Sequence, residues 1–321
     1  METRDETSAV LSEPMDRAVT GTPYDDVFRT LLTECPELVI PLVNEAFGEH
    51  YSRDAEVTVH HNEFFIGSNE KRVTDSHISI GKKKYHAECQ STADGTLMIR
   101  LFEYDAQIAI EDAEQRCSEV VFTFPYTTVL YLRCSRNTPS RMRVTIRVPG
   151  DSAGYEVPVV KVPEYTLEEI MEKELFFLLP FHLFRYEKNL GMYEKDGERL
   201  EELRDTYRRI VSYLDRKVEE RKLTAIQRWV IRETTRKVAE NLAVHHRKVR
   251  EGVTEVMGGQ ILELECVKQW NAGKAEGMLE GLSALVRTLK PILNDIDKVY
   301  EAVRKNETYA DVTREKVMEY F

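Results

Sequence analysis

The chain has 321 residues, of which 42% are hydrophobic and 31% are charged, and its formal net charge is −11 at pH 7. This composition provides a packed core and excludes wholesale disorder, and the length suits two domains or one domain with a large appendage. The acidic balance argues against a protein that binds nucleic acid through its overall charge. The 45 basic residues are nevertheless enough for a local positive groove.

The sequence predicts a cytoplasmic protein without a membrane partner. Its N-terminal segment is polar and lacks the apolar stretch of a signal peptide, and no run reaches the roughly 18 apolar residues of a membrane span. The five cysteines are scattered without C-x-x-C spacing, which favours thiols in a reducing compartment over a zinc site.

The first half of the chain predicts an α/β arrangement after a flexible leader at residues 1–22. Residues 24–32 show apolar side chains at helical spacing with acids at the N-terminal end, and residues 37–47 predict a short helix interrupted by prolines. The remaining elements expected in this half are strands at 56–66, 72–80 and 85–90, a helix at 97–114, and strands at 127–133, 141–148 and 155–162.

From residue 166 onward the pattern is helical. Thr166 and Glu169 have the spacing of a capping box, which predicts a helix that continues to Leu178. Apolar spacing predicts further helices at 198–220 and 224–250, and the small residues of 272–281 predict a linker or a weak small-residue repeat. The heptad-like spacing of 282–303 contains Pro291, which favours two packed helices over one coiled coil.

These elements predict a mixed α/β domain at 23–165 and a helical domain at 166–271. A linker with C-terminal helices is expected at 272–321, where the chain offers a surface for a homo-oligomer.

Residues 74–90 predict a hairpin of two strands. If residues 81–84 form the loop, Ile80 pairs with Tyr85, and directly opposed residues point to the same face. One face then collects polar side chains, with Asp75 opposite Gln90, His77 opposite Glu88, and Ser79 opposite His86. The other face is apolar, and a slip of one residue would mix the two faces, which supports this register.

Two carboxylates and an amide on one strand face suit Mg²⁺ or Mn²⁺, because both ions prefer oxygen ligands and retain bound water. Such an ion lowers the pKa of its water and neutralises charge on a phosphodiester transition state, and Gln90 is placed to orient that water. A solvated sheet face with ordinary polar residues explains the same alternation, so the pattern alone leaves both interpretations open.

The spacing of Asp75 before Glu88-x-Gln90, followed by Arg100 and Tyr104, resembles the PD-(D/E)XK nuclease superfamily. The resemblance is closest to the Rpn-type family of recombination-promoting nucleases and transposase-like proteins. The stretches that carry it are TPYDDVFRTLL (22–32), NEAF (44–47), NE (62–63), TDSHISI (74–80), YHAECQS (85–91), and the segments 165–188 and 256–265.

The resemblance spans residues 24–265 and implies a restriction-endonuclease-like core with the order helix, three strands, helix, strand. It implies that Asp75, Glu88 and the main-chain carbonyl of Cys89 are the metal ligands. Gln90 stands where the wider superfamily has a lysine that stabilises the attacking water, although glutamine is usual in the Rpn-like branch.

Four further residues have more than one interpretation each. Asp25 is either an extra acidic metal contact or an acid that stabilises the helix dipole, and Glu63 either approaches the metal or bonds at the sheet rim. Arg100 and Tyr104 share a helix face, where they either clamp a phosphate, brace Glu88, or make a structural contact.

The resemblance therefore implies a metal-dependent DNA endonuclease that hydrolyses phosphodiester bonds with metal-activated water. Its expected cofactor is Mg²⁺ or Mn²⁺, its partner is DNA, and its context is recombination or mobile elements. The alternative is a weakly active or inactive DNA-binding module that retained the nuclease fold.

Overall fold

The structure is a computed structural model that describes residues 22–60, 63–66, 70–73, 76–92, 94–258, 265–309 and 312–321. The chain forms two compact units, Met1–Gly259 and Gln260–Phe321, which are described separately below. Nearly all of the expected leader, residues 1–21, lies outside the described residues, and Thr22 already caps the first helix.

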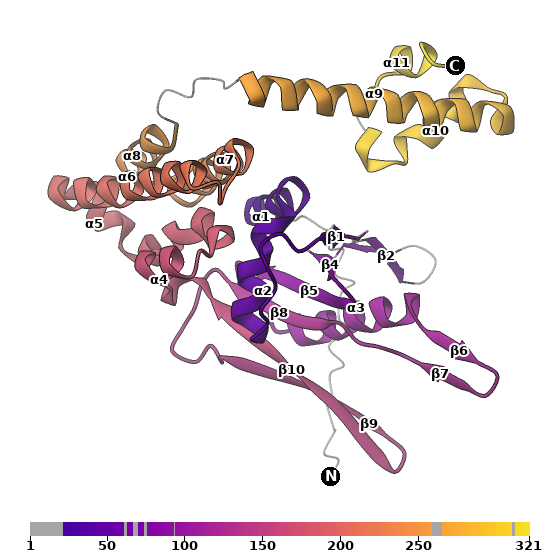
Figure 1. The fold of residues 1–321 in the computed structure, drawn as a ribbon, viewed down its shortest axis with the longest axis horizontal. Coiled ribbons are helices and arrows are strands. Elements are labelled where there is room, and N and C mark those ends of the chain that lie inside the picture. Colours follow the sequence, from indigo (N-terminus) through magenta and orange to yellow (C-terminus); the bar gives the residue numbers. More distant parts are fainter. Residues whose placement is uncertain are drawn as a thin grey trace, which may run out of the picture. The chain divides into compact units, whose positions relative to one another are not determined.

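A six-stranded mixed sheet forms the centre of the first unit (Figure 1). Its strands, in spatial order, are β1 (Val57–Val59), β4 (His77–Ile80), β5 (Lys83–Gln90), β8 (Tyr126–Tyr131), β10 (Asp151–Lys161) and β9 (Arg141–Val148). β5, β8 and β10 run parallel, and the other neighbours are antiparallel. Two small hairpins stand apart from this sheet, β2 (Glu63–Ile66) with β3 (Glu70–Val73), and β6 (Glu114–Arg116) with β7 (Glu119–Val121).

Different helices cover the two faces of the sheet. One face packs on α1 (Pro23–Glu34), η1 (Pro36–Val39) and α2 (Ile40–Phe47). The opposite face packs on α3 (Leu97–Glu111), which connects β5 to the parallel strand β8. Leu97 and Leu101 of α3 lie against Val129 and Val157 of the sheet. Burial on both faces is therefore limited to the central strands β4, β5 and β8, whereas β9 is largely exposed.

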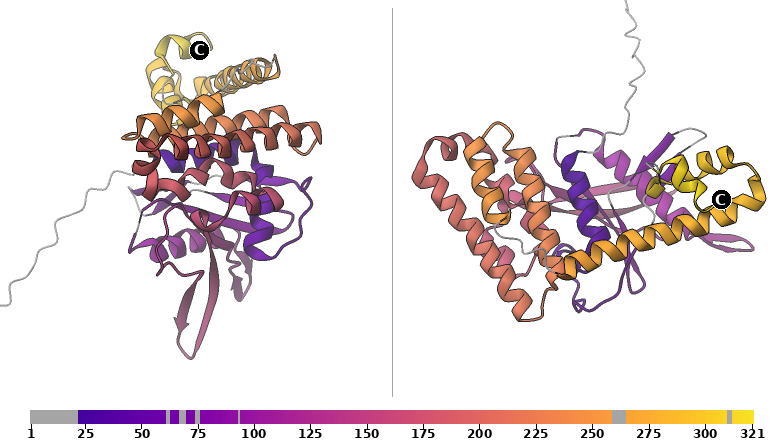
Figure 2. Two further views of the ribbon diagram at one scale, coloured as in Figure 1. Left: turned by 90° about the vertical axis from the view of Figure 1, so that its left-hand side faces the viewer. Right: turned by 90° about the horizontal axis from the view of Figure 1, so that it is seen from above.

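Helices complete the first unit after the sheet. They are η2 (Val162–Glu164), α4 (Leu167–Glu172), η3 (Phe176–Asn189), α5 (Leu190–Lys195), α6 (Gly197–Glu219), α7 (Ala225–Leu242) and α8 (Arg247–Gly258). α1 packs against α7 (Figure 2), and one hydrophobic core runs from Tyr24 to Met257. The sequence predicts divisions at 165/166 and 271/272, whereas the structure divides the chain after Gly259 and its core includes residues on both sides of 165/166.

A threonine side chain accepts a hydrogen bond at the N-terminus of three described helices of the first unit, α1, α4 and α7. The capping box of Thr166 and Glu169 is confirmed, but the expected continuation of its helix to Leu178 is wrong. α4 ends at Glu172, because Glu174 has a φ of +53° that an α-helix does not allow. The apolar residues that follow form the buried 3₁₀ segment η3 instead.

Two other expected elements divide in the structure. The predicted strand at 56–66 is two strands, β1 and β2, which belong to different sheets. The predicted helical region 224–250 is α7 followed by α8. Among the described residues, no helix is both long enough and apolar enough to cross a membrane.

The second unit consists of α9 (Glu265–Leu293), α10 (Ile296–Arg304), η4 (Glu307–Tyr309) and α11 (Arg314–Met318). Its small core contains Leu282, Val286, Val299, Val303 and Val317. The prediction of two packed helices around Pro291 is confirmed, because α9 ends two residues later and α10 packs against it. The predicted linker at 272–281 is wrong, since this stretch lies inside α9.

Candidate functional site

The hairpin of β4 and β5 has a shorter turn than the sequence predicts. Ile80 pairs with Lys83 and His77 pairs with His86, so only Gly81 and Lys82 lie between the paired ends. Gly81 has a φ of +60°, a backbone conformation that glycine adopts at little cost. The predictions of a four-residue loop and of a pair between His77 and Glu88 are therefore wrong. The observed loop is two residues shorter, and the pairing of the two strands is shifted by two positions. Because side chains alternate with a period of two, this even shift keeps His77, His86, Glu88 and Gln90 on one face.

The polar face of β5 is buried. The exposed fractions are 0% for His86, 3% for Glu88 and 6% for Gln90, because α3 packs over this face. Solvent-facing strands leave such side chains in water. The interpretation as a solvated sheet face is thus wrong for these three residues, and each of them needs a partner inside the protein.

His86 connects two buried carboxylates. Its Nδ1 lies 2.7 Å from Oδ1 of Asp105, and its Nε2 lies 3.3 Å from Oε1 of Glu88. Burial alone would lower the pKa of His86, but hydrogen bonds to Asp105 and Glu88 and their negative charges raise it to about 9. The imidazolium therefore donates both of its N–H groups at neutral pH.

Asp105, which the sequence analysis did not single out, anchors this arrangement. Its Oδ1 also accepts a hydrogen bond of 2.6 Å from the hydroxyl of Thr127 in β8, and its Oδ2 accepts one from the hydroxyl of Tyr155 in β10. The signal in the sequence is its place between Leu101 and Ile108 at helical spacing, where a carboxylate interrupts the apolar stripe of α3.

Arg100 braces Glu88 from the partly exposed side. Its Nη2 lies 3.6 Å from Oε2 of Glu88 and donates a 3.2 Å hydrogen bond to Oε1 of Gln90. Its Nη1 pairs with Oδ2 of Asp94 at 2.7 Å. The amide nitrogen of Gln90 donates to the carbonyl of Thr92, so both ends of this amide are engaged. Tyr104 is buried, and its ring meets the ring of His86 edge-on at 5.8 Å.

Asp25 lies in the first turn of α1, near the end of β5. It completes a capping box in which Oδ2 accepts a 2.6 Å hydrogen bond from the backbone of Thr22. The hydroxyls of Thr22 and Ser91 lie 3.5 Å apart and connect this helix start to β5. Burial raises the pKa of Asp25, the hydrogen bonds from Thr22 oppose this shift, and the charge of Glu88 adds to it. Asp25 therefore both caps α1 and is electrostatically coupled to Glu88.

Two of the predicted site residues have no described side chain. Asp75 lies outside the described residues, so its position relative to Glu88 stays a prediction. Glu63 pairs at the backbone with Val73 in the small sheet of β2 and β3, and thus belongs to a different sheet from Glu88. The main chain of Cys89 lies in the ladder between β5 and β8, opposite Leu130.

The ligand atoms that the described residues offer are of the type that a hard divalent cation prefers. Glu88, the Gln90 side chain and the Cys89 carbonyl all offer oxygen, which Mg²⁺ and Mn²⁺ prefer. Within the part of the chain that the structure describes, no group of three or more His, Cys, Asp and Glu side chains is arranged to hold a metal ion. A complete ligand set therefore depends on Asp75.

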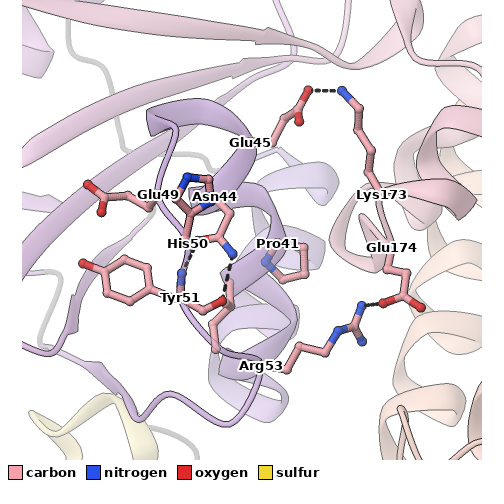
Figure 3. A pocket seen from close by; sticks show the side chains of 10 residues that line it. Pro41, Asn44, Glu45, Glu49, His50, Tyr51, Arg53, Lys173 and Glu174 are labelled. Atoms are coloured by element: carbon pink, nitrogen blue, oxygen red, sulfur yellow. Dashed lines mark hydrogen bonds and ion pairs between the residues drawn. The ribbon is translucent and has the colours of Figure 1, made fainter.

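A separate hollow of the first unit lies elsewhere. It measures about 400 Å³ and is lined by α2, the loop that follows it, and the end of α4. Four of its charged groups are paired with each other, Lys173 with Glu45 and Arg53 with Glu174 (Figure 3). Tyr51 at its wall bonds to Tyr85, which points to the face of β5 opposite Glu88. The hollow is therefore separate from the polar cluster.

The polar cluster of His86, Glu88, Gln90, Arg100 and Asp105 is the candidate site, since it combines buried carboxylates, a strongly perturbed pKa and a partly exposed arginine. Comparisons of this chain with protein-family models, with curated proteins and with solved structures gave no significant match.

Proposed function

We propose that the protein is a divalent-metal-dependent DNA endonuclease, a deoxyribonuclease that hydrolyses phosphodiester bonds with metal-activated water. The observation that carries the proposal is the buried Glu88 carboxylate, which lies between two cationic side chains and is coupled to Asp25. A protein gains little stability from burying such charges, and residues of this kind concentrate at functional sites.

The order of the elements supports a restriction-endonuclease-like core. α1 precedes the three antiparallel neighbours β1, β4 and β5, and α3 then leads to β8, which runs parallel to β5. Apart from η1, α2 and the two small hairpins, this order is helix, three strands, helix, strand. The PD-(D/E)XK nucleases, and the Rpn-type family within them, are expected to have the same order.

In this proposal Asp75, Glu88 and the carbonyl of Cys89 hold Mg²⁺ or Mn²⁺. The ion would supply an activated water and neutralise charge on the scissile phosphate. Arg100 is about one-third exposed at its side chain, so a DNA phosphate on the solvent side can approach its guanidinium beside the existing contacts with Asp94 and Glu88. The amide of Gln90 bonds to Arg100 and Thr92, so in this proposal it braces Arg100, and its role in orienting the water stays a prediction.

A second candidate is a DNA-binding module without catalytic activity. The observation in its favour is Arg100 itself, because its cation lies 3.6 Å from Oε2 of Glu88 and already neutralises the carboxylate. Such a module would retain DNA without cleaving it, and its affinity would fall steeply with salt.

The test is cleavage of plasmid and linear DNA by the purified full-length chain with Mg²⁺, with Mn²⁺ and with a chelator. We expect metal-dependent cleavage that Glu88→Ala and Glu88→Gln each reduce by at least about 100-fold, because ligand loss removes several kcal/mol of transition-state stabilisation. Glu168→Gln is the matched control, since Glu168 also pairs with an arginine but lies in α4. The proposal fails if the wild type does not cleave with any divalent cation, or if Glu88→Gln cleaves as fast as the wild type.

A further inference from the structure

A buried chain of hydrogen bonds ends on one oxygen of Glu88. It begins at the hydroxyls of Thr127 and Tyr155, passes through Asp105 and His86, and reaches Oε1 of Glu88. Asp105 and His86 are completely buried, and the chain joins four elements, α3, β5, β8 and β10.

We propose that His86 and Asp105 are positioning residues that fix Glu88 through Oε1 and leave Oε2 to bind the divalent ion. The inference rests on the proposed function, and it assigns a role to two residues that do not themselves hold the ion.

The geometry of Asp105 supports this role. A carboxylate that accepts three hydrogen bonds from three strands of one sheet cannot rotate without breaking at least one of them. Because Nδ1 of His86 is bonded to Asp105, the plane of the imidazole is fixed, and Nε2 points at Glu88. Partners of this kind orient metal ligands and determine how well an ion binds.

The two oxygens of Glu88 have different surroundings. Oε1 faces the buried interior through His86, whereas Oε2 lies 3.6 Å from the guanidinium of Arg100, whose side chain is 31% exposed. This guanidinium also bonds to Asp94 and Gln90. A guanidinium at the edge of the solvent can exchange a partner for a substrate phosphate, but a fully buried imidazole held at both nitrogens cannot. Oε2 is therefore the oxygen that can change partner.

A purely structural role for the chain of hydrogen bonds makes a different prediction. In that case, loss of His86 lowers the stability of the fold but leaves the affinity for metal unchanged. The positioning role lowers the affinity for metal in a protein that is still folded, so both quantities have to be measured.

The experiment uses the full-length chain and measures Mn²⁺ binding by calorimetry, with the thermal midpoint recorded for each variant. We expect His86→Gln to weaken Mn²⁺ binding by about 10- to 100-fold. His182→Gln is the matched control, because His182 is equally buried but lies in η3 and bonds to none of these residues. We expect its affinity to stay within about twofold of the wild type.

Two milder variants keep the test decisive if His86→Gln does not fold. Tyr155→Phe and Thr127→Val each remove one hydroxyl donor to Asp105, and we expect each to weaken Mn²⁺ binding by at least about threefold. For DNA cleavage, we expect kcat to fall and KM for DNA to stay constant, since DNA is not held by these residues.

The possible results separate the two proposals. If the wild type does not cleave DNA with any divalent cation, the proposed function fails, whether or not it binds Mn²⁺. If the wild type binds and cleaves, but the folded His86→Gln variant, or both milder variants, bind Mn²⁺ as tightly as the wild type, the positioning role is overturned and the proposed function stands.

Discussion

His182 should make the first unit sensitive to mild acid. Its side chain is 2% exposed within η3, between the rings of Tyr186 and Tyr207. Among the described residues, neither ring nitrogen has a hydrogen-bond partner. Burial, with a smaller contribution from the charge of Arg185, lowers the pKa of His182 to about 4. The folded protein therefore holds this imidazole in its neutral form.

The lowered pKa gives the sign and the size of the effect. An unfolded chain has a histidine pKa of about 6.5, so below that pH the unfolded state binds the proton and the folded state does not. The contribution of neutral His182 to the free energy of unfolding is complete above pH 6.5 and is lost as the pH falls towards 4. The full difference of about 2.5 pKa units corresponds to ~3 kcal/mol, of which ~2 kcal/mol is lost between pH 7 and pH 5.

The assay compares urea unfolding of the wild type and His182→Gln at pH 7 and pH 5. Trp229 packs against the same core, and its fluorescence is isolated in a Trp270→Phe background because the chain has two tryptophans. If glutamine packs less well than histidine at position 182, that cost in unfolding free energy does not depend on pH. Both proteins contain His86, so the titration of His182 is what distinguishes the wild type from the variant. From pH 7 to pH 5, we expect the urea concentration at the midpoint of unfolding to fall by roughly 0.5–1 M more in the wild type than in the variant. Equal losses in the two proteins would refute the reasoning.

Two further predictions concern the start of α1 and the second unit. Thr22→Ala removes the capping hydroxyl of α1 and should cost about 1 kcal/mol of unfolding free energy in urea titrations, whereas Thr30→Ala in the same helix should change it by less than about 0.5 kcal/mol. A change equal to that of Thr30→Ala would contradict the capping role. If the C-terminal helices associate the chain with itself, light scattering should give a multiple of 37.3 kDa for the full chain and a monomer for a chain that ends at Gly259, since Ile292 and Met318 of the second unit expose apolar side chains. A monomeric full chain would exclude this oligomer.

Local patterns predicted much of the fold because they depend on neighbours in sequence. The alternation of polar and apolar residues predicted β9 at 141–148 with its bounds, and helical spacing predicted α3 and α6 to within a few residues. The errors arise where tertiary context decides the outcome. Glycines suggested a linker at 272–281, but α10 and α11 pack on the C-terminal part of this helix.

The candidate site was predictable only in part. Strand alternation placed His86, Glu88 and Gln90 on one face, and this result survived a register error because the error was even. The alternation of polar and apolar residues in a strand does not reveal which element covers either face of the strand. The sequence of β5 therefore could not predict that α3 buries its polar face. Asp105, Thr127 and Tyr155 are separated by more than 20 residues from one another, and only the packing of α3, β8 and β10 brings them together. The presence of a carboxylate on the apolar side of α3 was the one local clue.

The packing of α1 against α7 has a consequence for synthesis on the ribosome. The core of the first unit needs both Tyr24 and Met257, so α1 leaves the ribosome long before its partners exist. At 5–20 residues per second, roughly 12–50 seconds separate the two ends of this core. During that interval the side of α1 that packs against α7 has no native cover. A nascent chain of this kind is a natural client for chaperones, and slow translation of the segment after the sheet would lengthen its exposure.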